Sequence, residues 1–337
     1  MALLDTFGRV ARDLRVSLTD RCNLRCAYCM PAEGLDWLPT PQVLSDDEVV
    51  RLIRVAVEVL GITKLRFTGG EPLLRKGLED IVAQSSSLRT PSGRRPELTL
   101  TSNALGLKHR AQKLREAGLD RVNISLDSLD RDRYANLTRR DRLDDALAGI
   151  ARAAEVGLSP VKINAVVMRG VNEEDVVSLA DFALRNGHQL RFIEQMPLSP
   201  REEWNRDDMV TQQEILGALR EAYSLSAAEE PRGAAPAQLW RVDPDADQPG
   251  GEIGVIASVT HPFCSACDRT RITADGQMRN CLFAHGETDL RGPLRDGASD
   301  EELAEVWRGG QWIKKAGHGI GEPSFEQPVR PMSSIGG

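Results

Sequence analysis

The sequence lacks a long uninterrupted hydrophobic run. Its apolar stretches, such as the one from Val49 to Leu60, are broken by charged residues well before the ~20 residues that a membrane-spanning helix needs. The first dozen residues also lack the apolar core and the small-residue cleavage site of a signal peptide, and they do not resemble a transit peptide. We therefore expect a cytoplasmic protein without a membrane partner.

The sequence has no excess of positive charge either. It holds 43 Lys and Arg against 50 Asp and Glu, a formal net charge of -7. Broad electrostatic binding to nucleic acid needs a basic surface, so we expect no nucleic-acid partner. Cysteine is scarce as well, with six residues in the whole sequence. Six clustered cysteines in a cytoplasmic chain are too few for a disulfide scaffold. Their grouping indicates metal binding or catalysis instead.

The sequence does contain a regular alternation of strand and helix signals. Its 337 residues, 41% hydrophobic and 28% charged, exclude the collagen, coiled-coil and disordered classes. Short β-like runs alternate with amphipathic helical stretches, which is the pattern of parallel βα units. The six expected strands are Leu14–Asp20, Thr63–Gly70, Glu97–Asn103, Arg121–Asp127, Val161–Val167 and Gln189–Met196.

Five of these strands alternate between apolar and polar residues. In the first strand, Leu14 and Val16 alternate with Arg15 and Ser17. A parallel sheet covered by helices on both faces is apolar throughout, so a polar face must meet something other than helices. An edge strand or a solvent-facing position explains any single polar residue, but agreement among five strands favours a barrel with a polar interior. We therefore expect an α/β fold of the barrel type.

The pattern changes after about Met209, so we expect two parts, residues 1–210 and residues 211–337. Thr211–Tyr223 predicts a helix, and Ser224–Gly251, rich in Ala, Pro, Glu and Asp, is predicted to be a loop or linker. A second unit follows with a strand at Glu252–Val259, a hairpin across Ala274–Gly276, a helix near Asp300–Lys315 and a Gly/Pro-rich tail.

The six cysteines form two groups of three. Cys22, Cys26 and Cys29 are spaced C-x3-C-x2-C directly after the first expected strand. Three thiolates on one loop can hold three irons of a [4Fe–4S] cluster and leave the fourth iron open to a small ligand. A zinc site is the alternative, but no histidine lies near this loop in the sequence.

The second group consists of Cys264, Cys267 and Cys281. Here the zinc alternative is stronger, because His261 and His285 flank the group and would complete a Cys3His site. Two similar sets that use all six cysteines nevertheless favour two similar clusters, each with an open coordination position.

The residues around the first group resemble the signature of the radical S-adenosylmethionine superfamily. The segment from Cys22 to Cys29 reads CNLRCAYC, with the aromatic Tyr28 just before the third cysteine. The segment from Gly69 to Pro72 reads GGEP at the end of the second expected strand. It is similar to the superfamily element whose backbone pairs with the methionine amino group of the cofactor. The resemblance implies a [4Fe–4S] cluster that cleaves S-adenosylmethionine.

The second group narrows the resemblance to the GTP 3',8-cyclase family, whose members are lyases that catalyse the first step of molybdenum cofactor biosynthesis. Cys264 to Arg271 reads CSACDRTR, Cys281 follows, and the sequence ends with Gly336-Gly337. The resemblance implies an incomplete (β/α)6 barrel with a smaller α+β C-terminal region, and a second [4Fe–4S] cluster whose open iron contacts the guanine. It also implies the reaction. A 5'-deoxyadenosyl radical removes the ribose C3' hydrogen of GTP, and ring closure at C8 gives (8S)-3',8-cyclo-7,8-dihydroguanosine 5'-triphosphate.

The sequence departs from the family at one turn. Thr101-Ser102-Asn103-Ala104 stands where the family usually has Thr-Thr-Asn-Gly. Alanine tolerates positive φ poorly, so if the turn needs glycine it must take another shape here.

The polar face of the strands carries basic residues suited to a triphosphate. Arg15, Lys64, Arg66 and Lys162 all project from it, and buried cations are costly unless they are paired or bind an anion. Salt bridges to Asp127 or Glu194 are the alternative explanation.

The resemblance assigns individual site residues. It implies that Arg269 and Arg271 are catalytic and that Arg15, Arg66, Thr101, Lys162, Arg269 and Arg271 contact GTP. It implies that S-adenosylmethionine is contacted by Tyr28, Gly70, Ser125 and Met196, with Glu71, Asn103, Asp127 and Arg191 as further candidates. The glycine-rich tail is either a lid over the site or a frayed terminus.

Two other functions compete with this interpretation. A peptide-modifying radical S-adenosylmethionine enzyme with an auxiliary cluster is disfavoured, because about a dozen residues before the first strand leave no room for a leader-binding domain and because Arg269 and Arg271 suit phosphate. A zinc-dependent binding module is the other. The sequence identifies no electron donor, and a second copy of the chain and the next enzyme of the molybdopterin pathway are candidate partners.

Overall fold

The computed structural model describes residues 2–198 and 204–336. Within them the strands form a twelve-stranded sheet in the order β12-β11-β10-β1-β2-β3-β4-β5-β6-β9-β8-β7. The six central strands are parallel, follow chain order and match the six predicted strands. The predicted parallel α/β fold is therefore confirmed. These strands are β1 (Asp13–Ser17), β2 (Lys64–Thr68), β3 (Glu97–Ser102), β4 (Arg121–Ser125), β5 (Lys162–Val167) and β6 (Gln189–Glu194).

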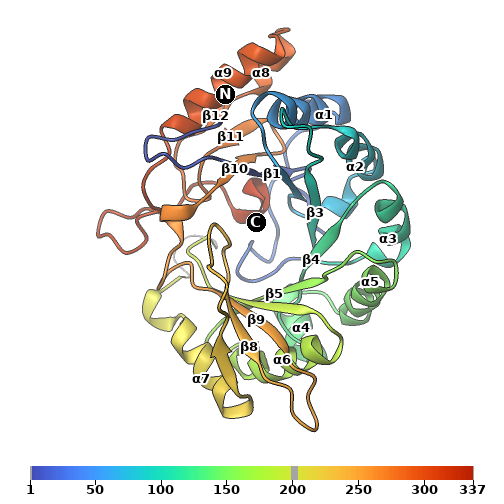
Figure 1. Cartoon of the computed structure of the whole chain (residues 1–337), viewed down its shortest axis with the longest axis vertical. Helices are drawn as coiled ribbons and strands as arrows, with labels where there is room; N and C mark the ends of the chain where they lie inside the picture. The colour runs from blue at the N-terminus through green and yellow to red at the C-terminus, as the bar shows by residue number, and fades with distance from the viewer. Residues whose placement is uncertain (1, 199–203, 337) are drawn as a thin grey trace.

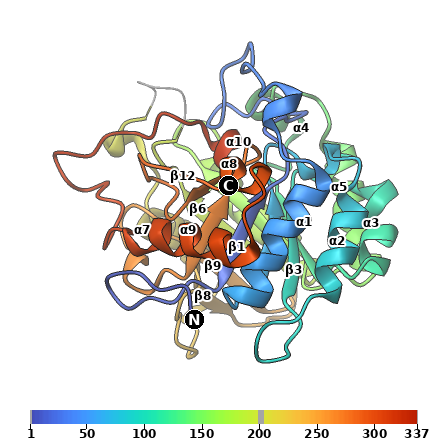
Figure 2. The ribbon, with the colours of Figure 1, turned by 90° about the horizontal axis from the view of Figure 1, so that it is seen from above.

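Helices cover the outer face of these strands (Figure 1 and Figure 2). The apolar residues of the strands, such as Leu98, Leu100 and Ile124, are fully buried in one core with helix residues such as Leu114. Burying a side chain of this size contributes roughly 1.5–3 kcal/mol, so the apolar face holds the helices against the sheet. The helices are α1 (Asp46–Arg54), α2 (Leu78–Ser87), α3 (Leu107–Glu116), α4 (Arg131–Thr138), α5 (Leu143–Glu155) and α6 (Val176–Arg185).

The C-terminal part adds strands to both edges of this sheet. β9 (Gly251–Ile256) pairs in parallel with β6, and β10 (Arg269–Ile272) pairs in parallel with β1. The predicted helix, strand, hairpin and final helix of this part are confirmed. The remaining elements are α7 (Gln212–Ala222), β7 (Leu225–Ala227), β8 (Gln238–Val242), β11 (Gln277–Arg279), β12 (Thr288–Asp289), α8 (Arg291–Arg295), α9 (Asp300–Trp312) and α10 (Met332–Ile335).

The prediction that Ser224–Gly251 is a loop or linker is wrong in part. This segment contains β7 and β8, which pair with each other, and β8 pairs with β9 in antiparallel fashion. A two-stranded hairpin is only marginally stable by itself. The edge of β9 supplies the hydrogen-bond partners, and composition alone carries no sign of that edge.

The arrangement places the loops that follow the parallel strands at one end of the sheet. In folds of this kind the functional groups lie at the carboxyl ends of the strands. The C-terminus lies within the ring of strands in Figure 1, so the end of the chain reaches the same region. Among the described residues, no helix is both long enough and apolar enough to cross a bilayer.

Candidate active site

All six cysteines line one pocket, although their two groups lie more than 230 residues apart in the sequence. Cys22, Cys26 and Cys29 lie on the loop after β1, while Cys264 and Cys267 precede β10. β10 runs parallel to β1, so the first group follows the carboxyl end of this strand pair, whereas Cys264 and Cys267 precede its amino end, and the pocket that all six cysteines line connects the two. All six are free thiols, which is the donor set that an iron–sulfur cluster requires.

The first cysteine group, Cys22, Cys26 and Cys29, fits a cluster whose protein ligands all come from one loop. Burial, followed by the charge of Cys22, raises the pKa of Cys29 to about 12. The backbone N–H of Leu24 donates to Cys22 Sγ at 3.5 Å, so a backbone donor already faces a ligating sulfur. Among the described residues, no three His, Cys, Asp or Glu side chains are close enough together to hold a single metal ion.

The glycines after β2 lie directly against the first cysteine loop. A Cβ on Gly69, whose φ is +140°, would stand 2.3 Å from the Thr19 carbonyl oxygen, and one on Gly70 would stand 2.3 Å from the Arg21 carbonyl oxygen. The Gly70 N–H donates to the Thr19 carbonyl at 2.7 Å. Only glycine permits this approach. The GGEP element therefore forms one wall of the space beside the three cysteines.

Glu71 joins this wall to the end of β3. Its buried carboxylate accepts hydrogen bonds from Ser102 Oγ at 2.8 Å and from the Asn103 N–H at 2.8 Å. Asn103 in turn donates to Asn23 Oδ1 at 2.8 Å, next to Cys22. Burial raises the pKa of Glu71 to about 7. Glu71, which the sequence predicts only as a further contact, thus holds three loops together around the cysteines.

The residues expected to contact S-adenosylmethionine lie together. Tyr28, Gly70, Ser125 and Met196 all line the pocket, as do Glu71, Asn103, Asp127 and Arg191. The Tyr28 hydroxyl donates to Asp127 Oδ2 at 2.9 Å, and the Val166 N–H donates to Asp127 Oδ1 at 2.9 Å. Burial raises the pKa of Asp127 to about 6. This pair fixes Tyr28 beside the first cysteine group.

The basic residues of the polar face lie side by side across neighbouring strands. Arg15 is in register with Arg66 on β2 and with Arg271 on β10. Burial, followed by repulsion from Arg271, lowers the pKa of Arg15, and burial followed by repulsion from Arg269 lowers that of Arg271 to about 10. Within residues 2–198 and 204–336, six guanidinium Nε atoms are buried without a hydrogen-bond partner, and four of them belong to residues that line the pocket, namely Arg15, Arg66, Arg191 and Arg269. Crowded and incompletely paired cations of this kind are suited to a polyanion.

The alternative pairing of these cations with Asp127 or Glu194 is wrong. Asp127 accepts from Tyr28 and from a backbone N–H, as described above. Glu194 accepts from the backbone N–H groups of Gln212, Val259 and Thr260, each at 2.9 Å, and so ties β6 to the C-terminal part. Arg66 instead pairs with Asp13, whose Oδ2 lies 3.9 Å from Arg66 Nη2.

Lys162 lies at the margin of the basic cluster. Arg15, Arg66, Thr101, Arg269 and Arg271 line the pocket, whereas Lys162 and Lys64 are not among the described residues that do. Burial lowers the pKa of Lys162 to about 8, with a further contribution from Arg191.

The C-terminal tail enters the pocket. Arg271 Nη1 donates to the Gly336 carbonyl, and Met332 and Ser333 line the pocket. A Cβ on Gly336, whose φ is +81°, would stand 2.7 Å from Thr68 Cγ2, so a larger residue would not fit there. Gly337, the other glycine of the terminal pair, lies outside the described residues.

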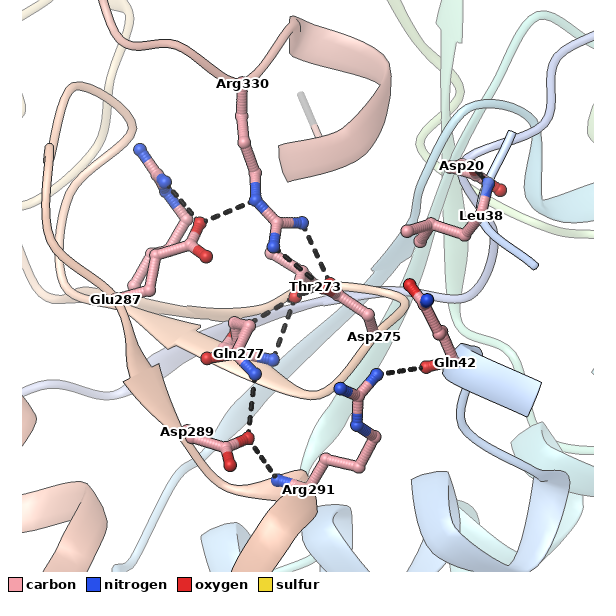
Figure 3. Close-up of polar contacts among 11 residues, drawn as sticks. Asp20, Leu38, Gln42, Thr273, Asp275, Gln277, Glu287, Asp289, Arg291 and Arg330 are labelled. Atoms are coloured by element: carbon pink, nitrogen blue, oxygen red, sulfur yellow. Dashed lines mark hydrogen bonds and ion pairs between the residues drawn. The ribbon is translucent and has the colours of Figure 1, made fainter. Parts of the chain in front are cut away.

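Arg330 connects this tail to the β10–β11 hairpin (Figure 3). Its guanidinium donates to both carboxylate oxygens of Asp275, at 2.9 and 2.7 Å, and its Nε lies 2.9 Å from Glu287 Oε1. Arg279 pairs with the same Glu287 oxygen at 2.5 Å. The tail is thus attached at both ends of its final turn.

The turn at Ala104 does not change shape to avoid positive φ. Ala104 is buried and adopts φ +65°, the left-handed conformation that glycine accepts more readily. The Ala104 N–H donates to Ser102 Oγ at 2.9 Å, and its carbonyl accepts from the Leu107 N–H at 3.0 Å. These bonds offset the backbone strain, so Asn103 remains in place beside the first cysteine group.

Sequence reasoning missed several lining residues. Asn164 has the polar parity on β5 and could have been included on that signal. Phe263, whose ring lies 4.5 Å from the Arg269 guanidinium carbon, and His318, whose Nε2 lies 2.9 Å from the Ser258 carbonyl, had no such signal. They come from loops whose position depends on tertiary packing.

Comparison with known proteins shows which families the chain matches. The Radical SAM superfamily model matches residues 16–183, and the Molybdenum Cofactor Synthesis C model matches residues 188–320. A GTP 3',8-cyclase of Corynebacterium glutamicum is 65% identical over 336 residues, covering 99% of this chain and 89% of that protein. Proteins with the same name from Mycobacterium sp. (strain KMS) and Mycolicibacterium smegmatis are 59% and 56% identical, again over 99% of this chain and over 93% and 92% of theirs.

Solved structures agree on the fold. Streptococcus suis SuiB bound to S-adenosylmethionine superposes with a TM-score of 0.58 at 16% identity, covering 94% of this chain and 68% of that one. At this identity the likeness concerns the fold alone.

Proposed function

The chain belongs to the GTP 3',8-cyclase family of radical S-adenosylmethionine enzymes, and on this premise we propose that its pocket cyclises GTP to (8S)-3',8-cyclo-7,8-dihydroguanosine 5'-triphosphate in the first step of molybdenum cofactor biosynthesis. One observation carries the proposal. A cluster of incompletely paired arginines lies in the same pocket as two groups of three free cysteines. A peptide-modifying activity does not account for these arginines.

Membership of this superfamily implies a [4Fe–4S] cluster and S-adenosylmethionine. In this chain Cys22, Cys26 and Cys29 would hold the cluster. Together with S-adenosylmethionine, it would supply the radical needed to remove the C3' hydrogen of GTP. Gly70 and the Tyr28–Asp127 pair would place the cofactor beside that loop, together with Ser125 and Met196. Close positioning and exclusion of water are the contributions that the protein itself makes to such chemistry.

The second cysteine group would hold a second [4Fe–4S] cluster at the opposite side of the substrate. Cys264, Cys267 and Cys281 are three free thiols on the same pocket, and three ligands leave one coordination position for the guanine. Supporting this assignment, His261 and His285 are not among the described residues that line the pocket. His318 does line it, but its Nε2 lies 2.9 Å from the Ser258 carbonyl oxygen and its Nδ1 accepts from the Ile320 N–H at 3.1 Å.

The basic cluster would bind the triphosphate. Arg15 and Arg66 provide guanidinium groups on adjacent strands, and Thr101 and Lys162 extend the polar face. Arg269 and Arg271 lie on β10 shortly after Cys267 and line the same pocket, so they would orient GTP for the reaction and act as the catalytic arginines. A bound triphosphate would relieve the repulsion among these cations, which favours binding.

The remaining assignments follow from the family and the sequence. We place the enzyme in the cytoplasm, with a division near residue 210 between the barrel and the C-terminal region. A homodimer and transfer of product to the next enzyme of the pathway remain proposals, and no residue identifies the electron donor.

Anaerobic turnover tests the function. After reconstitution with iron and sulfide and reduction, 5'-deoxyadenosine is quantified with GTP, with ATP and without nucleotide. We expect GTP alone to increase 5'-deoxyadenosine and to be converted into a cyclised nucleotide. Cys281→Ser serves as a variant that retains the first cysteine group, and we expect it to cleave S-adenosylmethionine without cyclising GTP. Cofactor cleavage that is indifferent to GTP would contradict the substrate assignment.

A further inference from the structure

Lys314 is a buried cation that the proposed reaction does not use. It follows α9 and is only 3% exposed. Its Nζ lies 2.8 Å from the Arg269 carbonyl oxygen, 3.4 Å from the Cys267 carbonyl oxygen and 3.3 Å from Cys267 Sγ. Among the described residues, Lys314 has no carboxylate within ion-pairing distance.

A buried ammonium group requires a compensating negative charge. The two carbonyl oxygens provide only partial charges, so the sulfur of Cys267 is the group that can carry a full one. Cys267 Sγ is the sulfur within 3.3 Å of the Lys314 ammonium group. The three cysteines of the second group are therefore not equivalent, and Cys267 is the one that faces a cation.

The position of Lys314 is held from outside the pocket. Arg9 donates to the carbonyls of Lys315 at 2.6 Å, Ala316 at 2.9 Å and Cys264 at 2.6 Å. Asp5 accepts from Arg9 Nε at 2.6 Å and fixes the guanidinium. The N-terminal segment that contains Asp5 and Arg9 thus holds the Lys314 loop against the second cysteine group, which gives the ammonium group a defined position.

We propose that Lys314 is a positioning residue whose ammonium group donates a hydrogen bond to the Cys267 thiolate and raises the reduction potential of the cluster bound there. This rests on the proposed second cluster. Reduction adds negative charge to a cluster, and a cationic donor beside a ligating sulfur stabilises the more negative form. The same contact makes Cys267 the electron-poor ligand of the three.

The test measures the midpoint potential of the second cluster by redox titration followed by electron paramagnetic resonance. The full chain carries Cys22→Ser, Cys26→Ser and Cys29→Ser, so that only the second group binds a cluster. Lys314→Met removes the charge and keeps the length of the side chain. Lys315→Met is the matched control, because Lys315 is the exposed neighbour. Lys314→Arg retains a cationic donor.

We expect Lys314→Met to reduce the equilibrium constant for cluster reduction at least about tenfold, which is a shift of about 59 mV to more negative potential for one electron. Lys315→Met and Lys314→Arg should remain close to the parent. Loss of iron from Lys314→Met with retention in Lys314→Arg would also support a role for the charge.

Two results would overturn the proposal. An unchanged potential in Lys314→Met at full iron content would show that the contact has no electronic effect, and loss of iron from both Lys314 variants would assign the residue to packing. If the parent protein without the first group binds no iron and sulfide, the second cluster itself is refuted, and iron analysis distinguishes that failure from the other two.

Discussion

Replacing Arg330 with alanine is expected to release the C-terminal turn from the pocket. Arg330 makes three charge-assisted contacts, two to Asp275 and one to Glu287, and the three side chains are 25%, 9% and 19% exposed (Figure 3). Contacts between charged groups contribute about 1.5–3 kcal/mol each, but they act here as one unit that is partly open to solvent. We therefore expect a loss of about 3 kcal/mol in the closed state of the tail, a factor of roughly 100 in its equilibrium.

Hydrogen exchange measures this equilibrium directly. The Ser334 and Gly336 N–H groups donate to the carbonyls of Pro331 and Met332 at 3.0 Å, so they exchange when the turn opens. In Arg330→Ala we expect the C-terminal peptide to exchange roughly 100 times faster, and in Arg330→Lys less so because the two-pronged geometry is lost but the charge stays. In turnover, an open pocket admits water, so we expect more 5'-deoxyadenosine for each cyclised nucleotide.

The control is Arg291→Ala. Arg291 lies on the other side of the same hairpin and donates to the Gln42 carbonyl at 2.6 Å, without contact to the tail (Figure 3). Its removal should leave exchange of the C-terminal peptide unchanged. Equal exchange in Arg330→Ala and the parent would refute the reasoning, because the remaining contacts, such as that of Arg271 with Gly336, would then hold the tail alone.

Three further predictions follow from individual residues. Ala104→Gly should stabilise the protein by about 1 kcal/mol in a denaturant titration, because φ +65° suits glycine. The control Ala111→Gly, inside α3, should destabilise the protein by about as much. A loss of stability in Ala104→Gly would contradict the strain argument. Burial lowers the pKa of His188, so the unfolded chain takes up a proton first as pH falls below about 6.5, and native stability is lost in that direction. His188→Phe should lose less stability than the parent between about pH 7 and 5, and identical pH profiles would refute this. Arg15→Met should raise the melting temperature of the nucleotide-free protein, because it relieves the repulsion from Arg271. It should also abolish the increase in melting temperature that GTP causes. A destabilised variant that still responds to GTP would contradict the assignment of Arg15 to the triphosphate site.

Much of the site could be predicted from local patterns. The alternation of polar and apolar residues placed Arg15 and Arg66 on one face of their strands, because side chains of a strand point to alternate sides. The cysteine spacing indicated two clusters for a similar reason, since a short loop holds its own ligands close together whatever the rest of the chain does. Such features depend on neighbours in the sequence. The structure has Arg15 and Arg66 in register and all six cysteines on one pocket, while the second cluster stays a proposal.

What only the tertiary structure decided involves contacts between distant segments. The register of β1 with β10 places Arg271 beside Arg15 across more than 250 residues, and no local pattern specifies that register. The same holds for the pairing of β8 with the edge of β9, for the ion pair between Arg330 and Asp275, and for the hydrogen bond from Lys314 to Cys267. In each case the stabilising free energy comes from burying two surfaces or pairing two charges that meet only after the chain has folded. The sequence by itself therefore determined the chemical groups, and the packing determined which of them act together.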